Sequence, residues 1–410
     1  MRPLYTAAIR LYAAAVHAAA PFNGKARKMI DGRRSIDDVL REKIIPGARY
    51  VWLHAASLGE FEQGRPLLEA IRQRHPDYKI VLTFFSPSGY DVRRDYPGAD
   101  VVCYLPFDFP RRIRAFLDRV RPTLALFVKY EFWLNTLDEL RRRRVPTYLV
   151  SGIFRPSQLF FRPIGRPYRD ALRCFDHLFV QDETSRQLLA GIGLTNVTVT
   201  GDTRFDRVID IRHAARPLPV VAAFAERDAR PVLIAGSSWP EDEALLIPYF
   251  NAHPELKLIL APHEIHEAHL AAIEARLTRP ALRLSRADAN TAASVDCLIV
   301  DSFGLLSSIY RYARIAYIGG GFGHGIHNAP EAAVYAVPVL FGPNHRKFRE
   351  ALDLIACGGA FSITDASTLS ARLDALLADP DACTAAGESA GAYIQQHSGA
   401  TEQILHSIGL

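Results

Sequence analysis

The sequence is poor in cysteine and holds none in a metal-binding pattern. Its 410 residues include five cysteines, scattered at positions 103, 174, 297, 357 and 383, without a Cys-x-x-Cys pair or a cluster of Cys and His. This argues against a disulfide scaffold or a zinc ribbon and is typical of a reducing compartment. Low-complexity tracts and repeats of fixed period are also absent. Because 49% of the residues are hydrophobic and 23% charged, a disordered chain is excluded.

The sequence also lacks a hydrophobic run long enough for a clear membrane span. Residues 4–22 are rich in alanine but are interrupted by Arg10 and His17, whereas a spanning helix needs about 20 strongly apolar residues. A signal peptide is an open alternative for this stretch, although no clear cleavage context leads into a secreted pattern. The stretch instead predicts an amphipathic helix whose apolar face contains Leu4, Ala8, Leu11, Tyr12, Ala15, Val16 and Ala19.

A basic run from Lys25 to Arg34 follows this helix. The formal net charge of +5 is mild, and its sign could suit nucleic acid, an anionic membrane or a phosphorylated substrate. An amphipathic helix beside basic residues favours association of residues 1–34 with a membrane surface. The alternative is an ordinary surface helix that packs on the first domain.

From about residue 48 onward, short apolar runs alternate with helical stretches. This pattern predicts parallel sheets built from βαβ units, and buried strands such as residues 101–105 and 124–128 are continuously apolar. A junction is expected within residues 209–231, after which the alternation restarts. We therefore expect two α/β domains, residues 35–215 and 216–410, whose ligands bind at the carboxyl ends of strands facing an interdomain cleft.

In the second half, four strand ends carry small or polar residues. The run Gly319-Gly320-Gly321 leads to a helix expected near Asn328, and Glu331 lies three residues further on the same face. Backbone amides there can hold a phosphate while the carboxylate accepts ribose hydroxyls; tight packing and a dipole-favouring first-turn Glu are the simpler alternatives. Together the four ends suggest a nucleotide site, the other three being Gly236-Ser237-Ser238, Pro262-His263 and Asp301 to Leu305.

In the first half, the turn Ser57-Leu58-Gly59-Glu60 follows a predicted strand and places Glu60 at a helix start. A carboxylate there can act as a general base, although it can also be a plain helix-terminal residue. Ser86, Ser88 and Gly89 form a second strand-to-helix turn suited to an anionic sugar. Further candidates at strand ends are Lys129, Glu131 and Arg155, each of which would alone be an ordinary loop residue.

The order of these motifs resembles the 3-deoxy-D-manno-octulosonic acid (Kdo) transferases of lipopolysaccharide assembly. The resemblance rests on ASLGEFEQGRPLLEAIR, TFFSPSGYD, KYEFWLN, SGIFRPSQ, GDTRFDRV, AGSSW, APHE, DSFGLL and GGGFGHGIHNAPEAAVYAVPVLFGP, and it reaches from the first helix to about residue 360. The chain is similar to the branch with Lys-Tyr-Glu-Phe-Trp in place of Met-Glu-Thr-Glu-Leu-Trp. Pro330 stands where the family has Leu, and proline is tolerated in a first helical turn.

The resemblance implies a glycosyltransferase-B fold of two Rossmann-like domains, CMP-Kdo as donor and lipid IVA as acceptor. It implies Glu60 as the general base of an inverting transfer, with neither a metal nor a further cofactor. It also implies the cytoplasmic face of the inner membrane as the location, with membrane lipid and not nucleic acid as a partner. The CMP contacts that it implies are Pro262, His263, Phe303, Gly304, Leu305, Asn328, Ala329, Pro330 and Glu331.

Two rival functions remain at this point. A nucleotide-sugar 2-epimerase shares the two-domain fold but has no need of a basic amphipathic helix. A membrane-bound binding protein could retain the fold without catalysis. Activity with CMP-Kdo and lipid IVA, absent with a UDP-sugar, distinguishes the transferase from both.

Overall fold

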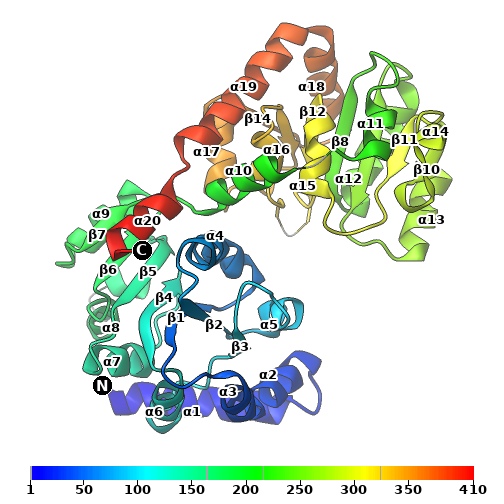
Figure 1. Ribbon diagram of the computed structural model, residues 1–410. Coiled ribbons are helices and arrows are strands. Elements are labelled where there is room, and N and C mark those ends of the chain that lie inside the picture. The colour runs from blue at the N-terminus through cyan, green and yellow to red at the C-terminus, as the bar shows by residue number, and fades with distance from the viewer. Residues whose placement is uncertain (1, 163–164, 216, 324) are drawn as a thin grey trace. The chain divides into compact units, whose positions relative to one another are not determined.

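The computed structural model describes residues 2–162, 165–215, 217–323 and 325–410, and Figure 1 shows its helices and strands. Contacts divide the chain into two compact units. The N-terminal unit consists of residues 1–206 and 398–410, and the C-terminal unit of residues 207–397. Each unit is built around its own parallel sheet.

The described strands of the N-terminal unit form a seven-stranded parallel sheet in the order β3-β2-β1-β4-β5-β6-β7. Their bounds are β1 Arg49–Ala55, β2 Tyr78–Phe84, β3 Val101–Tyr104, β4 Pro122–Val128, β5 Thr147–Gly152, β6 His177–Val180 and β7 Val197–Val199. The strand order reverses between β1 and β4. In open α/β sheets, ligands bind outside the carboxyl ends of strands at such a reversal.

Helices cover both faces of this sheet. Their bounds are α1 Arg2–Ala19, α2 Gly24–Arg34, α3 Ile36–Lys43, α4 Leu58–Arg74, α5 Pro87–Arg93, α6 Pro110–Val120, α7 Leu134–Arg142, η1 Leu159–Phe161, α8 Arg166–Leu172, α9 Glu183–Ala190 and α20 Ala400–Ile408. Side chains of α3, α6, α7, α8 and α9 enter one buried cluster, and those of α4 and α20 enter the other.

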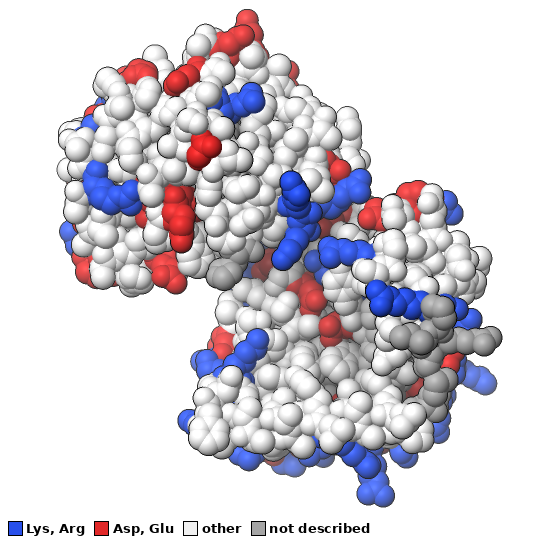
Figure 2. Space-filling model, turned by 180° about the vertical axis from the view of Figure 1, so that it is seen from behind, with Lys and Arg blue, Asp and Glu red and all other residues white. Residues whose placement is uncertain are grey.

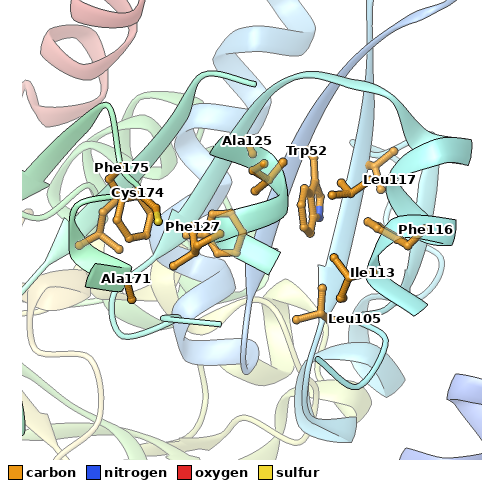
Figure 3. Packing of buried hydrophobic residues seen from close by; sticks show 14 of the residues in the cluster. Trp52, Leu105, Ile113, Phe116, Leu117, Ala125, Phe127, Ala171, Cys174 and Phe175 are labelled. Atoms are coloured by element: carbon orange, nitrogen blue, oxygen red, sulfur yellow. The ribbon is translucent and has the colours of Figure 1, made fainter. Parts of the chain in front are cut away.

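Strand β1 shows how the two faces are filled. Trp52 enters the first cluster while Val51 and Leu53 enter the second, because successive side chains of a strand point to opposite faces. The centroid of the Trp52 ring lies 5.2 Å from that of Phe116 and 5.3 Å from that of Phe127. Figure 3 shows this packing from close by. Burial on both faces explains why the strands form continuous apolar runs, as the sequence predicts.

The described strands of the C-terminal unit form a second seven-stranded parallel sheet, in the order β10-β11-β9-β8-β12-β13-β14. The strands are β8 Val232–Ser238, β9 Lys257–Pro262, β10 Ala281–Arg283, β11 Cys297–Ile299, β12 Ile315–Ile318, β13 Val339–Phe341 and β14 Ala360–Ser362. Here the strand order reverses between β8 and β12.

The helices of this unit are mostly short near the carboxyl ends of the central strands. They are α10 Arg204–Ala214, α11 Pro219–Ala225, α12 Pro240–Ala252, α13 Glu267–Arg276, η3 Leu284–Arg286, α14 Ala289–Ala292, α15 Leu306–Ile309, η4 Tyr310–Tyr312, α16 Pro330–Ala333, α17 Arg349–Ala356, α18 Ala366–Ala378 and α19 Pro380–Gln396. The helix expected near Asn328 is the single turn α16.

The division of the chain differs from the single boundary placed near residue 215. The chain passes from the first unit to the second between residues 206 and 207, within α10. Arg216 lies outside the described residues. The last 13 residues pack with the N-terminal unit, where Ile404 and Leu405 are buried in the core with α4. Asp206 also accepts hydrogen bonds from the backbone of Gly399 (2.5 Å) and Thr401 (2.6 Å), which fixes the start of α20.

The N-terminal segment begins with helix α1, which packs on its unit with most of the predicted apolar face turned outward. Tyr5 donates a hydrogen bond to Asp108 (2.7 Å), and Ala13 is buried. Leu4 and Leu11, both on the predicted apolar face, are 76% and 73% exposed. None of the helices in the described part of the chain combines the length and apolar character needed to cross a bilayer.

Candidate functional site

The sequence-predicted Glu60 lies at the start of α4, directly after β1. Its Oε2 accepts hydrogen bonds from the backbone N–H groups of Ala56 (2.7 Å) and Ser57 (3.1 Å), so the carboxylate caps its own helix. Within the described residues, no hydrogen bond to Oε1 accompanies these two. One oxygen is therefore fixed by the backbone while the other is left to receive a proton.

The surroundings of Glu60 make its carboxylate more basic. Burial raises the pKa of Glu60 above its ordinary value, and the neighbouring Glu131 charge raises it further. The Ala56 N–H, Lys129 and His54 act in the opposite direction without cancelling the shift. A raised pKa brings a carboxylate closer to the range in which a general base works best.

Glu131, at the carboxyl end of β4, is buried and held by two donors. His54 Nε2 lies 2.9 Å from Glu131 Oε2, and the Trp133 indole N–H donates to the same oxygen at 2.7 Å. On the other side of the ring, His54 Nδ1 lies 2.9 Å from the Thr83 hydroxyl and 3.1 Å from the Thr83 carbonyl oxygen. The sequence predicted Glu131, but His54 was missed because it lies inside an apolar strand.

Lys129 brings positive charge to the same end of the sheet. Its backbone is left-handed, with φ of 58°, and its amide donates to Val150 O at 3.0 Å. Its charge favours the ionised forms of both Glu60 and the buried Asp202. Although burial acts to raise the pKa of Asp202, Arg204 and Lys129 lower it overall. The turn after β4 thus places one cation among carboxylates.

The remaining N-terminal candidates differ in what they can contact. Ser86 caps α5 by accepting from Ser88 N (3.3 Å), and Ser88 is exposed. Gly89 is buried against the Phe84 ring, where a Cβ would collide, so its smallness serves packing. Arg155 is exposed after β5, and its charge opposes the rise that burial causes in the pKa of Tyr130.

In the C-terminal unit, aromatic side chains gather after three neighbouring strands. Trp239 follows β8, His263 follows β9 and His327 follows β12. The rings of Trp239 and His263 are stacked with centroids 4.6 Å apart, and the His263 and His327 centroids are 4.5 Å apart. His263 is exposed, so this stack offers a flat face to a ligand. Of these three residues, the sequence analysis predicted only His263. Trp239 and His327 could have been found because each is next to a predicted site residue, Ser238 and Asn328.

The hydrogen bonds of this stack fix the state of one imidazole. The Trp239 indole N–H donates to His327 Nε2 at 3.0 Å, and an indole can only donate. His327 is therefore neutral, with its proton on Nδ1. Burial lowers the pKa of His327 to about 4, and the neighbouring His263 acts in the same direction. Asp242 supports the arrangement by accepting from the backbone N–H of both Trp239 (2.9 Å) and Gly320 (2.8 Å).

Asn328 and Glu331 meet as the sequence predicts. Asn328 Nδ2 donates to Glu331 Oε1 at 2.8 Å, while Asn328 Oδ1 is buried without a hydrogen-bond partner among the described residues. An unpartnered buried oxygen is costly and suits a ligand donor such as a hydroxyl. Ala329 and Pro330 are buried beneath this pair and shape the turn.

The other predicted C-terminal residues line neighbouring strand ends. Pro262 is buried at the end of β9, whereas Phe303 is 77% exposed before α15. Gly304 has φ of 87°, a conformation that favours glycine, and Leu305 is half-buried. Ser238 is fully buried and donates to Glu243 (2.9 Å), so its hydroxyl supports the fold.

The end of β8, where the register with β9 shifts between Gly236 and Ser238, is closely packed. Ser237 has φ of 52°, an uncommon backbone conformation for a residue other than glycine, and Gly236 packs against Tyr310.

Among the residues that the structure describes, no group of three or more His, Cys, Asp or Glu could hold a metal ion.

Comparisons with known proteins support one family. A family model described as 3-deoxy-D-manno-octulosonic-acid transferase (kdotransferase) matches residues 29–207. A 3-deoxy-D-manno-octulosonic acid transferase of Bordetella pertussis is 31% identical over 382 residues, which cover 88% of this chain and 87% of the relative. A transferase of the same name from Haemophilus influenzae is 24% identical over 373 residues, covering 88% and 86%.

A solved structure shows the same fold with another activity. The UDP-GlcNAc 2-epimerase of Neisseria meningitidis, bound to UDP-GlcNAc, matches with a TM-score of 0.59 at 13% identity, covering 88% of this chain and 99% of that one. At this identity the likeness shows the fold alone, which is the predicted glycosyltransferase-B fold of two Rossmann-like units. The relatives of higher identity name the activity: the chain belongs to the 3-deoxy-D-manno-octulosonic acid transferases, the glycosyltransferases that transfer Kdo in lipopolysaccharide biosynthesis.

Proposed function

We propose that this transferase moves Kdo from CMP-Kdo to lipid IVA, with inversion at the anomeric carbon and with Glu60 as general base. The observation that carries the proposal is the Glu60 carboxylate, whose Oε2 is fixed by two backbone N–H groups and whose pKa is raised. The N-terminal unit binds the acceptor and the C-terminal unit binds the donor.

The reaction uses one proton transfer and one displacement. Glu60 takes the proton of an acceptor sugar hydroxyl as its oxygen attacks the anomeric carbon of Kdo. The new C–O bond forms while the bond from that carbon to the phosphate oxygen breaks, and CMP leaves with the bonding electrons. Attack opposite the leaving group inverts the configuration. The transfer needs no metal or further cofactor in this proposal.

Donor recognition is assigned to the strand ends of the C-terminal unit. Asn328 Oδ1 accepts from a ribose hydroxyl, and Glu331 accepts from the second hydroxyl. The exposed face of His263 stacks on the cytosine, supported from behind by Trp239. Pro262 shapes the end of β9, and the turn of Phe303, Gly304 and Leu305 closes over the nucleotide.

Acceptor recognition is assigned to the N-terminal unit. Lys129 and the exposed Arg155 supply positive charge for a phosphorylated sugar, and Ser86 and Ser88 supply hydroxyl groups. The negative charge of Glu131 raises the pKa of Glu60.

The same unit is proposed to lie on the cytoplasmic face of the inner membrane. The outward face of α1 exposes Leu4, Leu11 and Tyr12 by 76%, 73% and 42%, and Phe22 beyond it is 93% exposed. Ala8, Ala15 and Ala19 on this face are exposed as well. A contiguous apolar face of this kind on a helix that is already packed on its other side favours an interfacial position.

Basic residues flank that face on two elements. Lys25, Arg27 and Lys28 are exposed in α2, and Arg111, Arg112 and Arg114 are exposed in α6, which the sequence reasoning left unassigned. Arg10 of α1 and Arg114 of α6 line one surface pocket, so the two helices adjoin. Figure 2 shows Lys and Arg side chains along the lower edge of the view, where Figure 1 places α1, α2 and α6. Each such residue near an anionic surface contributes about 1 kcal/mol.

The test of the proposed activity is product mass after incubation with lipid IVA micelles and one of two donors. CMP-Kdo is expected to yield lipid IVA carrying Kdo, and UDP-GlcNAc is expected to remain unchanged. Conversion of UDP-GlcNAc to its 2-epimer without any Kdo transfer would favour the epimerase alternative. Binding of CMP-Kdo without turnover would favour a binding protein.

A further inference from the structure

We propose that α1 is a structural part of the catalytic site as well as a membrane contact, and that Phe85 is the positioning residue that transmits its effect to Glu131. This inference rests on the proposed function, because it concerns how the N-terminal unit is prepared for transfer.

The first observation is a continuous stack of aromatic rings from α1 to the carboxylate. Tyr12 of α1 is stacked on Phe85, with centroids 6.1 Å apart and planes at 26°. Phe85 is stacked on Trp133, with centroids 4.7 Å apart and planes at 28°. The Trp133 indole N–H then donates to Glu131 Oε2 at 2.7 Å. The ring of Phe85 therefore fixes the indole that holds Glu131.

A buried cation also contacts Phe85. Arg33 is 5% exposed, and its guanidinium lies 4.7 Å from the Phe85 centroid and 4.4 Å from the Phe107 centroid. It also donates to the Phe85 carbonyl at 3.0 Å. Burial lowers the pKa of Arg33 to about 10, which still leaves it charged at neutral pH. Cation–π contacts and the hydrogen bond together give Phe85 a defined position between α2 and Trp133.

A second connection runs from α1 to the first turn of α7, directly after Trp133. Tyr5 donates to Asp108, and Asp108 also accepts from the backbone N–H of Asn135 (2.9 Å) and from both the N–H (2.9 Å) and the hydroxyl (2.7 Å) of Thr136. Asn135 Nδ2 returns a bond to Thr6 of α1 at 3.2 Å. These bonds fix the first turn of α7, which follows directly on Trp133.

The loop that carries Lys129, Glu131 and Trp133 is thus held at its α7 end by two connections to α1. Loops placed by a rigid support keep a catalytic geometry, and a displacement of about 1 Å can cost about 100-fold in rate. It follows that loss of these contacts impairs transfer even to an acceptor that requires no membrane. A helix that serves only to anchor the enzyme would be dispensable for such an acceptor.

The experiment compares variants on a deacylated, water-soluble form of the acceptor disaccharide, with no lipid present. Phe85→Leu and Tyr12→Ala are expected to lower kcat by roughly 10- to 100-fold with the KM for CMP-Kdo unchanged, and Phe85→Tyr is expected to restore most of the rate. Leu11→Gln, which alters the outward face of α1 but not the stack, is the matched control and should keep the wild-type kcat.

A second readout does not depend on activity. The near-ultraviolet circular dichroism of Trp133, obtained as the difference from Trp133→Phe, should change in Phe85→Leu and not in Leu11→Gln. Wild-type kcat in Phe85→Leu and Tyr12→Ala, or an unchanged Trp133 signal, would overturn the inference. Absence of Kdo transfer by the wild-type enzyme, with the Trp133 signal altered as expected, would instead refute the proposed function.

Discussion

Replacing both exposed leucines of α1 by glutamine should release the enzyme from anionic membranes. Burying a leucine side chain contributes about 1.5–3 kcal/mol. Leu4 and Leu11 are 76% and 73% exposed, so about three quarters of that energy, or about 1–2 kcal/mol each, is available on insertion. The double variant should therefore lose about 2–4 kcal/mol, a roughly 30- to 1,000-fold weaker partition. Glutamine and leucine have similar helix propensities, so α1 should persist.

The assay is co-sedimentation with vesicles that contain phosphatidylglycerol, repeated with pure phosphatidylcholine and at high salt. Leu352→Gln, at a leucine of the C-terminal unit that is 41% exposed, is the matched control and should bind like the wild type. Salt should weaken the contribution of the basic residues while leaving the effect of the leucines. Equal partition of the double variant and the wild type would refute the membrane-contact reasoning.

Three further predictions concern the site and the fold. Because the pKa of Glu60 is raised, kcat/KM should fall with decreasing pH at a pKa above that of an ordinary Glu. Glu131→Gln removes the neighbouring negative charge and should move this fall to lower pH. An unchanged pH profile would contradict the repulsion between Glu131 and Glu60. Trp239→Phe keeps an aromatic ring in the stack but removes the hydrogen bond to His327, so the KM for CMP-Kdo should rise roughly 2- to 10-fold at constant kcat. An unchanged KM would count against a role of this stack in binding the donor. Ile404→Ala should cost about 2–5 kcal/mol in denaturant unfolding of the N-terminal unit, whereas a change in the exposed Gln403 should not.

Much of the fold could be predicted from the sequence because parallel strands buried on both faces are continuously apolar. The same logic located Glu60 and Glu131, which stand where predicted strands end. Interior positions gave no such signal: His54 lies within a buried strand, and its partner Glu131 is 77 residues away in sequence. Periodicity correctly identified the apolar face of α1 but could not say whether that face packs inward or faces solvent.

Long-range packing explains the other differences. The return of α20 to the N-terminal unit depends on Asp206 and on a core position beside α4, neither of which leaves a local pattern. Trp239 and His327 are 88 residues apart, and only the neighbouring places of β8 and β12 in the sheet bring them together. Local periodicity and turn chemistry do not contain such pairings.

The most direct test of the central claim is Kdo transfer by Glu60→Gln, measured as product mass with CMP-Kdo and lipid IVA beside the binding of CMP-Kdo to the same variant. Glutamine retains an oxygen that can accept from Ala56 and Ser57, so the start of α4 is preserved. Glu62→Gln, two residues along the same helix, is the control. The account predicts that Glu60→Gln binds the donor normally and loses transfer, while Glu62→Gln retains it. Transfer by Glu60→Gln near the wild-type rate would contradict the role of Glu60 as general base.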